Sequence, residues 1–276
     1  MSIKQVTRSV WGNPGNRGRR LYKTLAAVRW QFQKRIVRSP RTIMLANGVR
    51  FRAYPDCVVS SALIYADWPE FHELRFVRKQ LCPTDLVVDV GANVGHVSLL
   101  LADIVGAENL VAFEPTPVTY ARLVENWQLN GWQTDRLYQA AVGATAGKVC
   151  LRDVPHPLTT NAVGPVLGPT IEVPLVSLDD FRADLPDRRI GLLKIDVEGY
   201  ESKVFGGCRR LLSENRPRLV MFESLQGHID AEIATVLADA GYASFELNAD
   251  GRPDFARATA QNQFAVPAET IAHLER

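Results

Sequence analysis

The sequence has few cysteines, and their spacing excludes a disulfide framework or a zinc site. Cys57, Cys82, Cys150 and Cys208 are the only four in 276 residues, and no two of them form a C-x-x-C pair. We therefore expect reduced thiols. No apolar run approaches the roughly 20 residues of a membrane span, and the amino terminus lacks the apolar core of a signal peptide. These absences favour a cytoplasmic protein.

Acidic residues are missing from the first 55 positions. This segment carries 13 of the 32 Lys and Arg residues, whereas the rest of the chain has 19 basic and 30 acidic residues. A basic arm on an acidic body indicates an anionic partner, which would be an anionic membrane surface or an anionic substrate. No nucleic acid is expected, because no nucleic-acid-binding motif accompanies the basic residues.

The basic arm is predicted to have two parts. Residues 1–20 contain several Gly and Pro residues and are predicted to be a flexible basic tail. Residues 21–38 are predicted to form a helix with one apolar stripe, made of Leu21, Leu25, Val28, Phe32 and Ile36. Two interpretations of the stripe compete. It packs on the body of the protein, or it lies on a membrane and makes the protein peripheral.

The arm leads into the rest of the chain through further short elements. Residues 42–54 are predicted to be a hairpin that turns at Asn47-Gly48, and residues 67–81 a helix. The expected organisation is therefore a tail over 1–20, an N-terminal helix, hairpin and helix over 21–80 that pack on the core, and the main domain over 81–276.

An apolar run that ends in a carboxylate and two glycines begins this main domain. Leu86–Val90 is predicted to be a buried strand, and a helical apolar pattern follows Gly95. Glycine allows unusual backbone angles and a helix start has unpaired N–H groups, so we expect a ligand at this turn. A dinucleotide site would need glycine where Asn93 and His96 stand. The spacing G-x-N-x-G instead favours a nucleoside without phosphate, such as S-adenosylmethionine.

A second apolar run ends in Glu114, which is 25 residues after Asp89. In nucleotide-binding α/β sheets an acid at the end of the second strand accepts hydrogen bonds from ribose hydroxyls. We therefore expect the cofactor to be bound by Asp89, Gly91, Ala92, Asn93, Gly95, Glu114 and Pro115.

Strands and helices alternate through the rest of the chain. Further strands are predicted near residues 136–142, 191–199, 218–223, 243–247 and 263–266, with an antiparallel pair at 147–152 and 171–176. This alternation predicts an α/β fold: a Rossmann-like, doubly wound, mostly parallel sheet with the site at the carboxyl ends of its strands.

Four sequence blocks together resemble the FkbM family of methyltransferases. They are residues 89–95, 113–115, 193–201 and 218–223, and the likeness covers roughly residues 60–267. The block Lys194–Gly199 is the specific part. The resemblance implies a class I methyltransferase sheet with an antiparallel last strand, and S-adenosylmethionine as cofactor. It also implies O-methylation of a hydroxyl on a sugar, glycolipid or other natural-product-like small molecule.

Methyl transfer to a hydroxyl requires positioning of the acceptor and a group that takes its proton. Lys194, Asp196 and Glu198 alternate along a strand end, so their side chains share one face. We expect Asp196 to orient the acceptor or act as base, with Glu198 second and Lys194 polarising an acceptor oxygen. Alternatively, the three form a structural ion-pair cluster.

Other interpretations remain at this stage. Because carboxylates suit magnesium, Asp196, Glu198, Glu223 and His228 are an alternative metal site, although no metal is the first expectation. An NAD-dependent oxidoreductase is one alternative function. A non-catalytic Rossmann scaffold that binds a glycan or another partner is the other.

Overall fold

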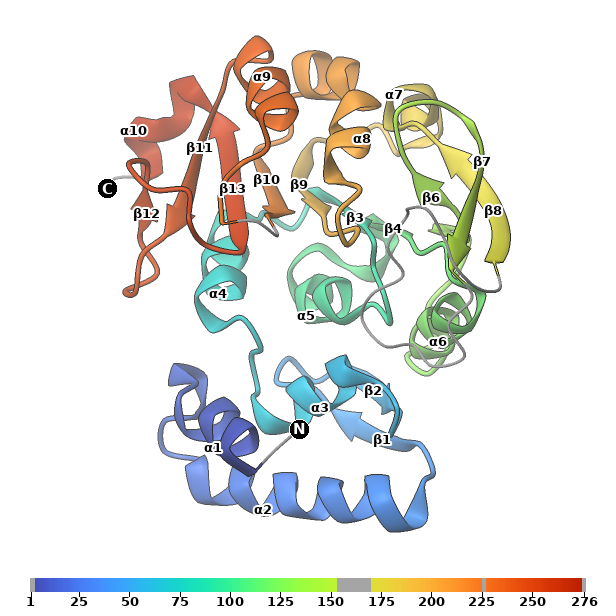
Figure 1. Ribbon diagram of the computed structural model, residues 1–276, viewed down its shortest axis with the longest axis vertical. Helices are drawn as coiled ribbons and strands as arrows, with labels where there is room; N and C mark the ends of the chain where they lie inside the picture. Colours follow the sequence, from blue (N-terminus) through green and yellow to red (C-terminus); the bar gives the residue numbers. More distant parts are fainter. Residues whose placement is uncertain (1–2, 153–169, 225–226, 275–276) are drawn as a thin grey trace.

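A single large sheet organises the chain in the computed structural model, which describes residues 3–152, 170–224 and 227–274. The strand order is β12-β11-β13-β10-β9-β3-β4-β5 (Figure 1). The parallel strands are β3 (Leu86–Val90), β4 (Leu110–Phe113), β5 (Leu137–Tyr138), β9 (Ile190–Ile195) and β10 (Leu219–Glu223). The others are β11 (Tyr242–Leu247), β12 (Pro253–Asp254) and β13 (Asn262–Pro267). Strand β13 is antiparallel to both neighbours, which confirms the predicted sheet.

Helices cover both faces of this sheet (Figure 1). One face carries α4 (Phe71–Gln80), α5 (His96–Val105) and α6 (Pro117–Gln128), and the other carries α7 (Leu178–Phe181), α8 (Glu201–Gly206) and α9 (Ala231–Asp239). Each face has its own apolar core, because the strands are buried on both sides and most of their residues are apolar. Asp89 on β3 and Lys194 on β9 are buried polar exceptions. The remaining short helices are η3 (Ala107–Asn109), η4 (Arg182–Asp184), η5 (Leu211–Asn215), η6 (Ala268–Thr270) and α10 (Ile271–Leu274).

The strand predicted near residues 136–142 is two strands in two sheets. Strand β5 completes the large sheet, whereas β6 (Ala141–Val142) pairs in parallel with β8 (Thr170–Val176). Strand β7 (Gly147–Arg152) pairs antiparallel with β8, as predicted. The chain therefore changes sheets between Tyr138 and Ala141, and the three-stranded sheet β6-β8-β7 lies beside the site.

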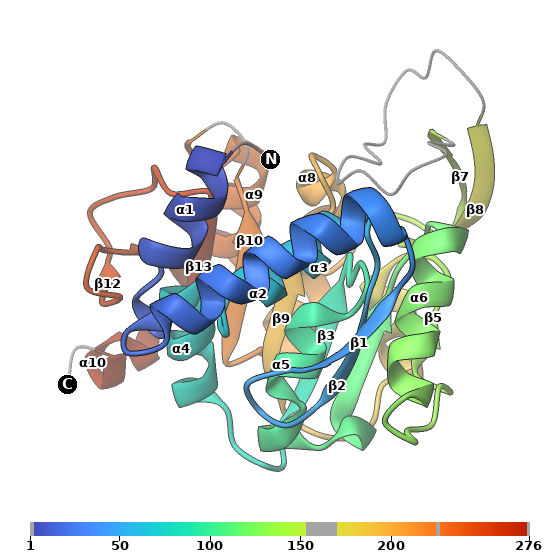
Figure 2. The same cartoon turned by 90° about the horizontal axis from the view of Figure 1, so that it is seen from below.

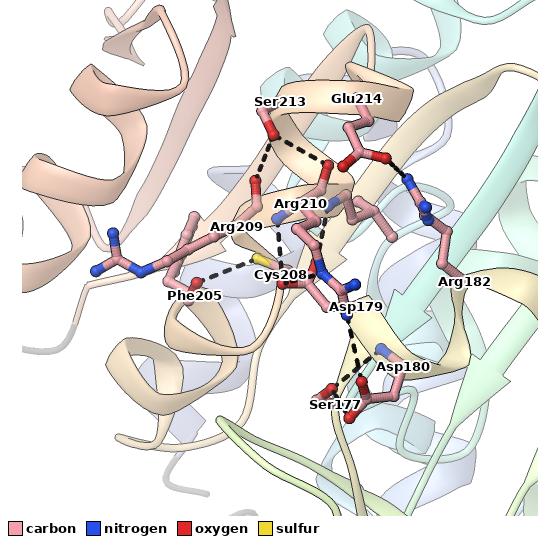
Figure 3. Close-up of polar contacts among 11 residues, drawn as sticks. Ser177, Asp179, Asp180, Arg182, Phe205, Cys208, Arg209, Arg210, Ser213 and Glu214 are labelled. Carbon is pink, nitrogen blue, oxygen red and sulfur yellow. Dashed lines mark hydrogen bonds and ion pairs between the residues drawn. The ribbon is translucent and has the colours of Figure 1, made fainter.

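The carboxylate of Asp179, which follows β8, connects the end of the three-stranded sheet to the segment after α8 (Figure 3). The carboxylate of Asp179 accepts hydrogen bonds from the backbone N–H groups of Arg210 and Leu211, at 3.1 and 2.8 Å. It thus caps the helical segment that leads into η5. Cys208 beside it is a free thiol whose pKa is raised by burial, so it packs as a neutral, small apolar group.

Residues 3–20, the described part of the predicted tail, contain helices. Helix α1 (Ile3–Trp11) and the short helix η1 (Pro14–Asn16) are formed, and the Asn16 side chain is buried. Its amide donates hydrogen bonds to the carbonyl oxygens of Val10 and Tyr65, both at 2.8 Å. The segment is ordered because this one polar side chain joins it to α3 (Val58–Tyr65), a helix that the sequence did not predict.

Helix α2 (Arg20–Phe32), continued by η2 (Gln33–Val37), docks on α3, but not through the predicted stripe. Lys23, Ala27 and Trp30 are its buried residues. The Trp30 indole donates a hydrogen bond to the Ser61 hydroxyl at 3.0 Å, and Lys23 pairs with Asp67 at 2.7 Å. The docking interpretation is therefore right for the helix and wrong for its face, because Ser61 on α3 and Asp67 just after it are polar partners for the other side. The predicted hairpin is formed by β1 (Arg41–Met44) and β2 (Arg50–Ala53).

Candidate active site

A cavity of about 290 Å³ opens at the carboxyl ends of β3, β4 and β9. This is the point where the strand order reverses, the usual ligand position in doubly wound sheets. Helix α3 and the segment before α4 cover it from the N-terminal part of the chain. The lining includes Val58, Ala62, Glu70, Gly91, Asn93, His96, Phe113, Glu114, Pro115, Val142, Asp196, Glu198, Tyr200 and Glu223.

The bend between β3 and α5 has the backbone shape that its glycines predict. Gly91, Asn93 and Gly95 all have positive φ angles, of 74°, 54° and 85°. A Cβ atom on Gly91 would lie 1.8 Å from the carbonyl oxygen of Asp196, and one on Gly95 would lie 2.6 Å from the Trp127 ring. Both glycines are therefore required by close packing of the protein on itself, and not only by a ligand as expected from the sequence.

The backbone N–H groups of the bend are already used. Those of Gly91 and Ala92 donate to the Phe113 carbonyl, that of Asn93 to the Glu114 carboxylate, and that of Gly95 to the Ala92 carbonyl. A phosphate group at a helix start depends on such N–H groups being free. The internal bonding of these four N–H groups therefore disfavours a pyrophosphate at the bend itself.

Glu114 lies at the end of β4 with only 6% of its surface exposed. Its two carboxylate oxygens accept hydrogen bonds from the backbone N–H groups of Asn93 and Thr116, at 3.0 and 2.9 Å. Burial raises the pKa of Glu114, and these two N–H groups oppose that shift. Each oxygen keeps a second lone pair, so the carboxylate is held rigidly on the cavity wall with accepting capacity left over.

Lys194 on β9 is buried and forms an ion pair with Asp89 on the neighbouring strand β3. Its Nζ lies 3.2 Å from Asp89 and 3.4 Å from Asp196, and it donates to the Gly91 carbonyl at 2.8 Å. Burial lowers its pKa, but the charges of Asp196 and Asp89 outweigh that effect and raise it. Lys194 does not line the large cavity. Its placement thus favours the structural ion-pair alternative over polarisation of an acceptor.

Glu198 has the backbone and the electrostatics of a functional carboxylate. Its φ angle of 55° lies in the left-handed region, which non-glycine residues rarely adopt outside turns and strained sites. Burial, and then the negative charges of Glu223 and Asp196, raise its pKa to about 7. At neutral pH, Glu198 is therefore poised to take up a proton.

Glu70 is a site residue that the sequence did not reveal. It precedes α4, has a φ angle of 51° and lines the cavity. Part of Glu70 is exposed to solvent, but the protein around its carboxyl group, and then the charge of Asp196, raise its pKa to about 7. It comes from the N-terminal part of the chain, about 125 residues before Asp196, so only the fold brings the two together. Its one local signal was the sequence Trp68-Pro69-Glu70 at a helix start.

His96 begins α5 and also lines the cavity. Burial and the nearby charge of Lys194 lower its pKa to about 4, so its imidazole is neutral at physiological pH. Its Nδ1 atom is buried without a hydrogen-bond partner among the described residues. The ring is thus available to contact a ligand, but it is a weaker base than either glutamate.

The expected cofactor residues divide into two groups. Gly91, Asn93, Glu114 and Pro115 line the cavity, whereas Asp89, Ala92 and Gly95 lie behind it. Asp89 is fully buried, accepts a hydrogen bond from Ser98 at 2.7 Å and pairs with Lys194, so it supports the bend from within.

The alternative metal set gains no support from the geometry. Among the residues that the structure describes, no group of three or more His, Cys, Asp or Glu side chains is placed to hold a metal ion. Asp196, Glu198 and Glu223 share the cavity, but His228 is not among its lining residues.

A model of the methyltransferase FkbM domain matches residues 89–244, which is more than half of the chain. The protein belongs to the FkbM methyltransferase family. The family assignment agrees with the resemblance found in the sequence, and it replaces the NAD-dependent oxidoreductase alternative.

Named relatives differ in what they methylate. The chain is 29% identical over 208 residues to the 31-O-demethyl-FK506 methyltransferase FkbM of Streptomyces tacrolimicus, covering 64% of this chain and 78% of that protein. It is 23% identical over 194 residues to the hexuronic acid methyltransferase AglP of Haloferax volcanii, covering 68% and 76%. Among solved structures it resembles M. jannaschii TYW2 in complex with AdoMet, with a TM-score of 0.40, 13% identity and coverage of 83% and 84%.

Proposed function

We propose that this methyltransferase uses S-adenosylmethionine to methylate a hydroxyl oxygen on an uncharged acceptor, such as a neutral sugar, a glycolipid or another natural-product-like small molecule. The observation that carries the proposal is the charge of the cavity wall. It contains five carboxyl groups, those of Glu70, Glu114, Asp196, Glu198 and Glu223, and among its described lining residues no Lys or Arg. Such a wall favours a cofactor with a net positive charge and disfavours an acceptor with a net negative charge.

The residues present fit this cofactor. S-adenosylmethionine supplies, when bound, a methyl group on a positively charged sulfur. Glu114 is placed to accept hydrogen bonds from the ribose hydroxyls, because its oxygens are held at the cavity wall by Asn93 and Thr116. Phe113 and Val142 offer apolar surface beside Glu114, against which the adenine ring of the cofactor would pack. The occupied N–H groups of the bend are compatible with a nucleoside that carries no phosphate.

Glu198 is proposed to take the proton of the acceptor hydroxyl. As the acceptor oxygen is methylated, its proton would pass to the carboxylate of Glu198. A base with a pKa of about 7 is well matched to neutral pH. Asp196, which Lys194 holds at 3.4 Å, is proposed to orient the acceptor. Asp196 thus keeps one of the two roles expected from the sequence, and only the role of base passes to Glu198.

The test is the pH dependence of S-adenosylhomocysteine release with a panel of neutral hydroxyl acceptors and their uronic-acid counterparts. We expect neutral acceptors to be preferred. The rate should rise about tenfold per pH unit below pH 7 and level off above it, because Glu198 must be deprotonated.

Two glutamate-to-glutamine substitutions distinguish the proposed base from the other glutamate with a pKa raised to about 7. Glu198→Gln should lower kcat/KM by about 10²- to 10⁴-fold and abolish the rise near pH 7. Glu70→Gln, at a carboxyl with a similar pKa, should keep that rise. The opposite pattern would transfer the role of base to Glu70, and a preference for uronic acids would refute the neutral acceptor. Cofactor binding without transfer to any acceptor would favour the scaffold alternative.

A further inference from the structure

The apolar stripe of α2 is exposed along its whole length. Leu21, Leu25, Val28, Phe32 and Ile36 have between 59% and 79% of their surfaces accessible, and we call these five residues the α2 stripe. Met44 on the neighbouring strand β1 is 65% exposed. Figure 2 shows α2 in front of α3, with β1 and β2 beside it. The helix thus buries Trp30 and Ala27 inward and presents a second apolar face outward.

A groove lies beside the stripe, between α2, β1 and α3. Its volume is about 300 Å³. The walls are about half apolar and half polar, with Leu25, Ile43 and Met44 among the apolar lining residues. Two exposed arginines, Arg29 from α2 and Arg41 from β1, also line it. A groove of this kind suits a ligand with a negatively charged group attached to hydrocarbon.

Positive charge surrounds both features. Arg29 adjoins the middle of the α2 stripe, and Arg35 and Arg38 lie at its carboxyl end, all of them exposed. Within the described residues, none of the three forms an ion pair with an acid, and the first acidic residue of the chain is Asp56. Apolar side chains flanked by unpaired arginines are typical of helices that lie on anionic bilayers.

We propose that the surface formed by the α2 stripe, Met44 and the α2–β1 groove binds the face of an anionic phospholipid bilayer. The stripe inserts at the level of the headgroups, and Arg29 and Arg41 receive a lipid phosphate in the groove. This is attachment and not insertion across the bilayer, since no helix among the described residues is long and apolar enough to span one.

Such docking would place the candidate active site close to the lipid. Helix α3 contributes Leu63 and Ile64 to the groove, and Val58, Val59 and Ala62 to the active-site cavity. One helix, about 10 Å across, therefore separates the two cavities. The proposal does not depend on the identity of the acceptor, and its test uses no methyl donor.

The experiment is cosedimentation of the full-length protein with two kinds of vesicle, one of phosphatidylcholine and one of equal parts phosphatidylcholine and phosphatidylglycerol. We expect binding to the anionic vesicles and little to the neutral ones. Arg29→Gln with Arg41→Gln should weaken it about 25-fold, since each charge near the surface is worth about fivefold. The matched control is Arg209→Gln, at an arginine with a 53% exposed side chain, and it should leave binding unchanged. Arg209 follows α8, and α8 lies at the opposite end of the molecule from α2 (Figure 1).

A second pair of variants tests the apolar part. Val28→Ser with Phe32→Ser should also reduce vesicle binding while leaving the melting temperature unchanged, because both side chains are 61% exposed. Equal binding to both vesicle types, or an equal loss with Arg209→Gln, would overturn the proposal. So would the absence of vesicle binding, including the case in which two copies of the chain associate through the α2 stripe and the serine variants make them monomeric.

Discussion

Replacing the buried Lys194 by methionine should destabilise the protein far more than the same replacement at the half-exposed Lys203. The substitution keeps most of the side-chain volume but leaves Asp89, which is fully buried, without its cationic partner at 3.2 Å. Removing one member of a buried pair costs about 3–5 kcal/mol. For a chain of this size we therefore expect the melting temperature to fall by about 6–20 °C.

The assay is thermal unfolding followed by circular dichroism. Lys203→Met is the control, because Lys203 is half-exposed and lies 3.8 Å from Glu232, so its pair is worth about 0–1 kcal/mol. The double variant Lys194→Met with Asp89→Asn should regain part of the loss, because it removes the uncompensated charge. If Lys194→Met and Lys203→Met lowered the melting temperature equally, the stabilising role of the buried Lys194–Asp89 ion pair would be refuted.

Two further substitutions probe the supports of the site. Asp179→Ala should lower the free energy of unfolding by about 1–2 kcal/mol through loss of a helix cap, measured by urea denaturation, whereas Asp180→Ala, at a more exposed carboxylate without backbone contacts to that helix, should cost less. Gly91→Ala should cost several times more than Gly131→Ala in the same assay. Both glycines have a φ angle of 74°, but only at Gly91 does the new methyl group meet backbone atoms. Equal losses at the two glycines would show that the loop around Asp196 yields easily.

Features that local sequence determines were predicted correctly. Buried parallel strands are continuous apolar runs, so β3, β4, β9 and β10 were evident, and the Asn47-Gly48 turn identified its hairpin. The acids at the strand ends could likewise be placed at one edge of the sheet, and Glu114 and Glu198 do line the cavity.

What the sequence missed depends on partners that are distant along the chain. The orientation of α2 is set by Trp30 and its bond to Ser61, which overrides the more regular stripe. Glu70 enters the cavity only because the N-terminal part of the chain folds over the sheet. The use of the backbone N–H groups at the bend likewise depends on Phe113, a residue of the next strand. Periodicity carries none of this information.

The most direct test of the central claim is titration calorimetry with S-adenosylhomocysteine. We expect one site per chain, with binding weakened about 10- to 150-fold in Glu114→Gln, because hydrogen bonds to a charged group contribute about 1.5–3 kcal/mol. Glu232→Gln, at an exposed glutamate that pairs with Lys203, should bind like the wild type. Absence of binding, or equal affinity of the wild type and Glu114→Gln, would contradict the account.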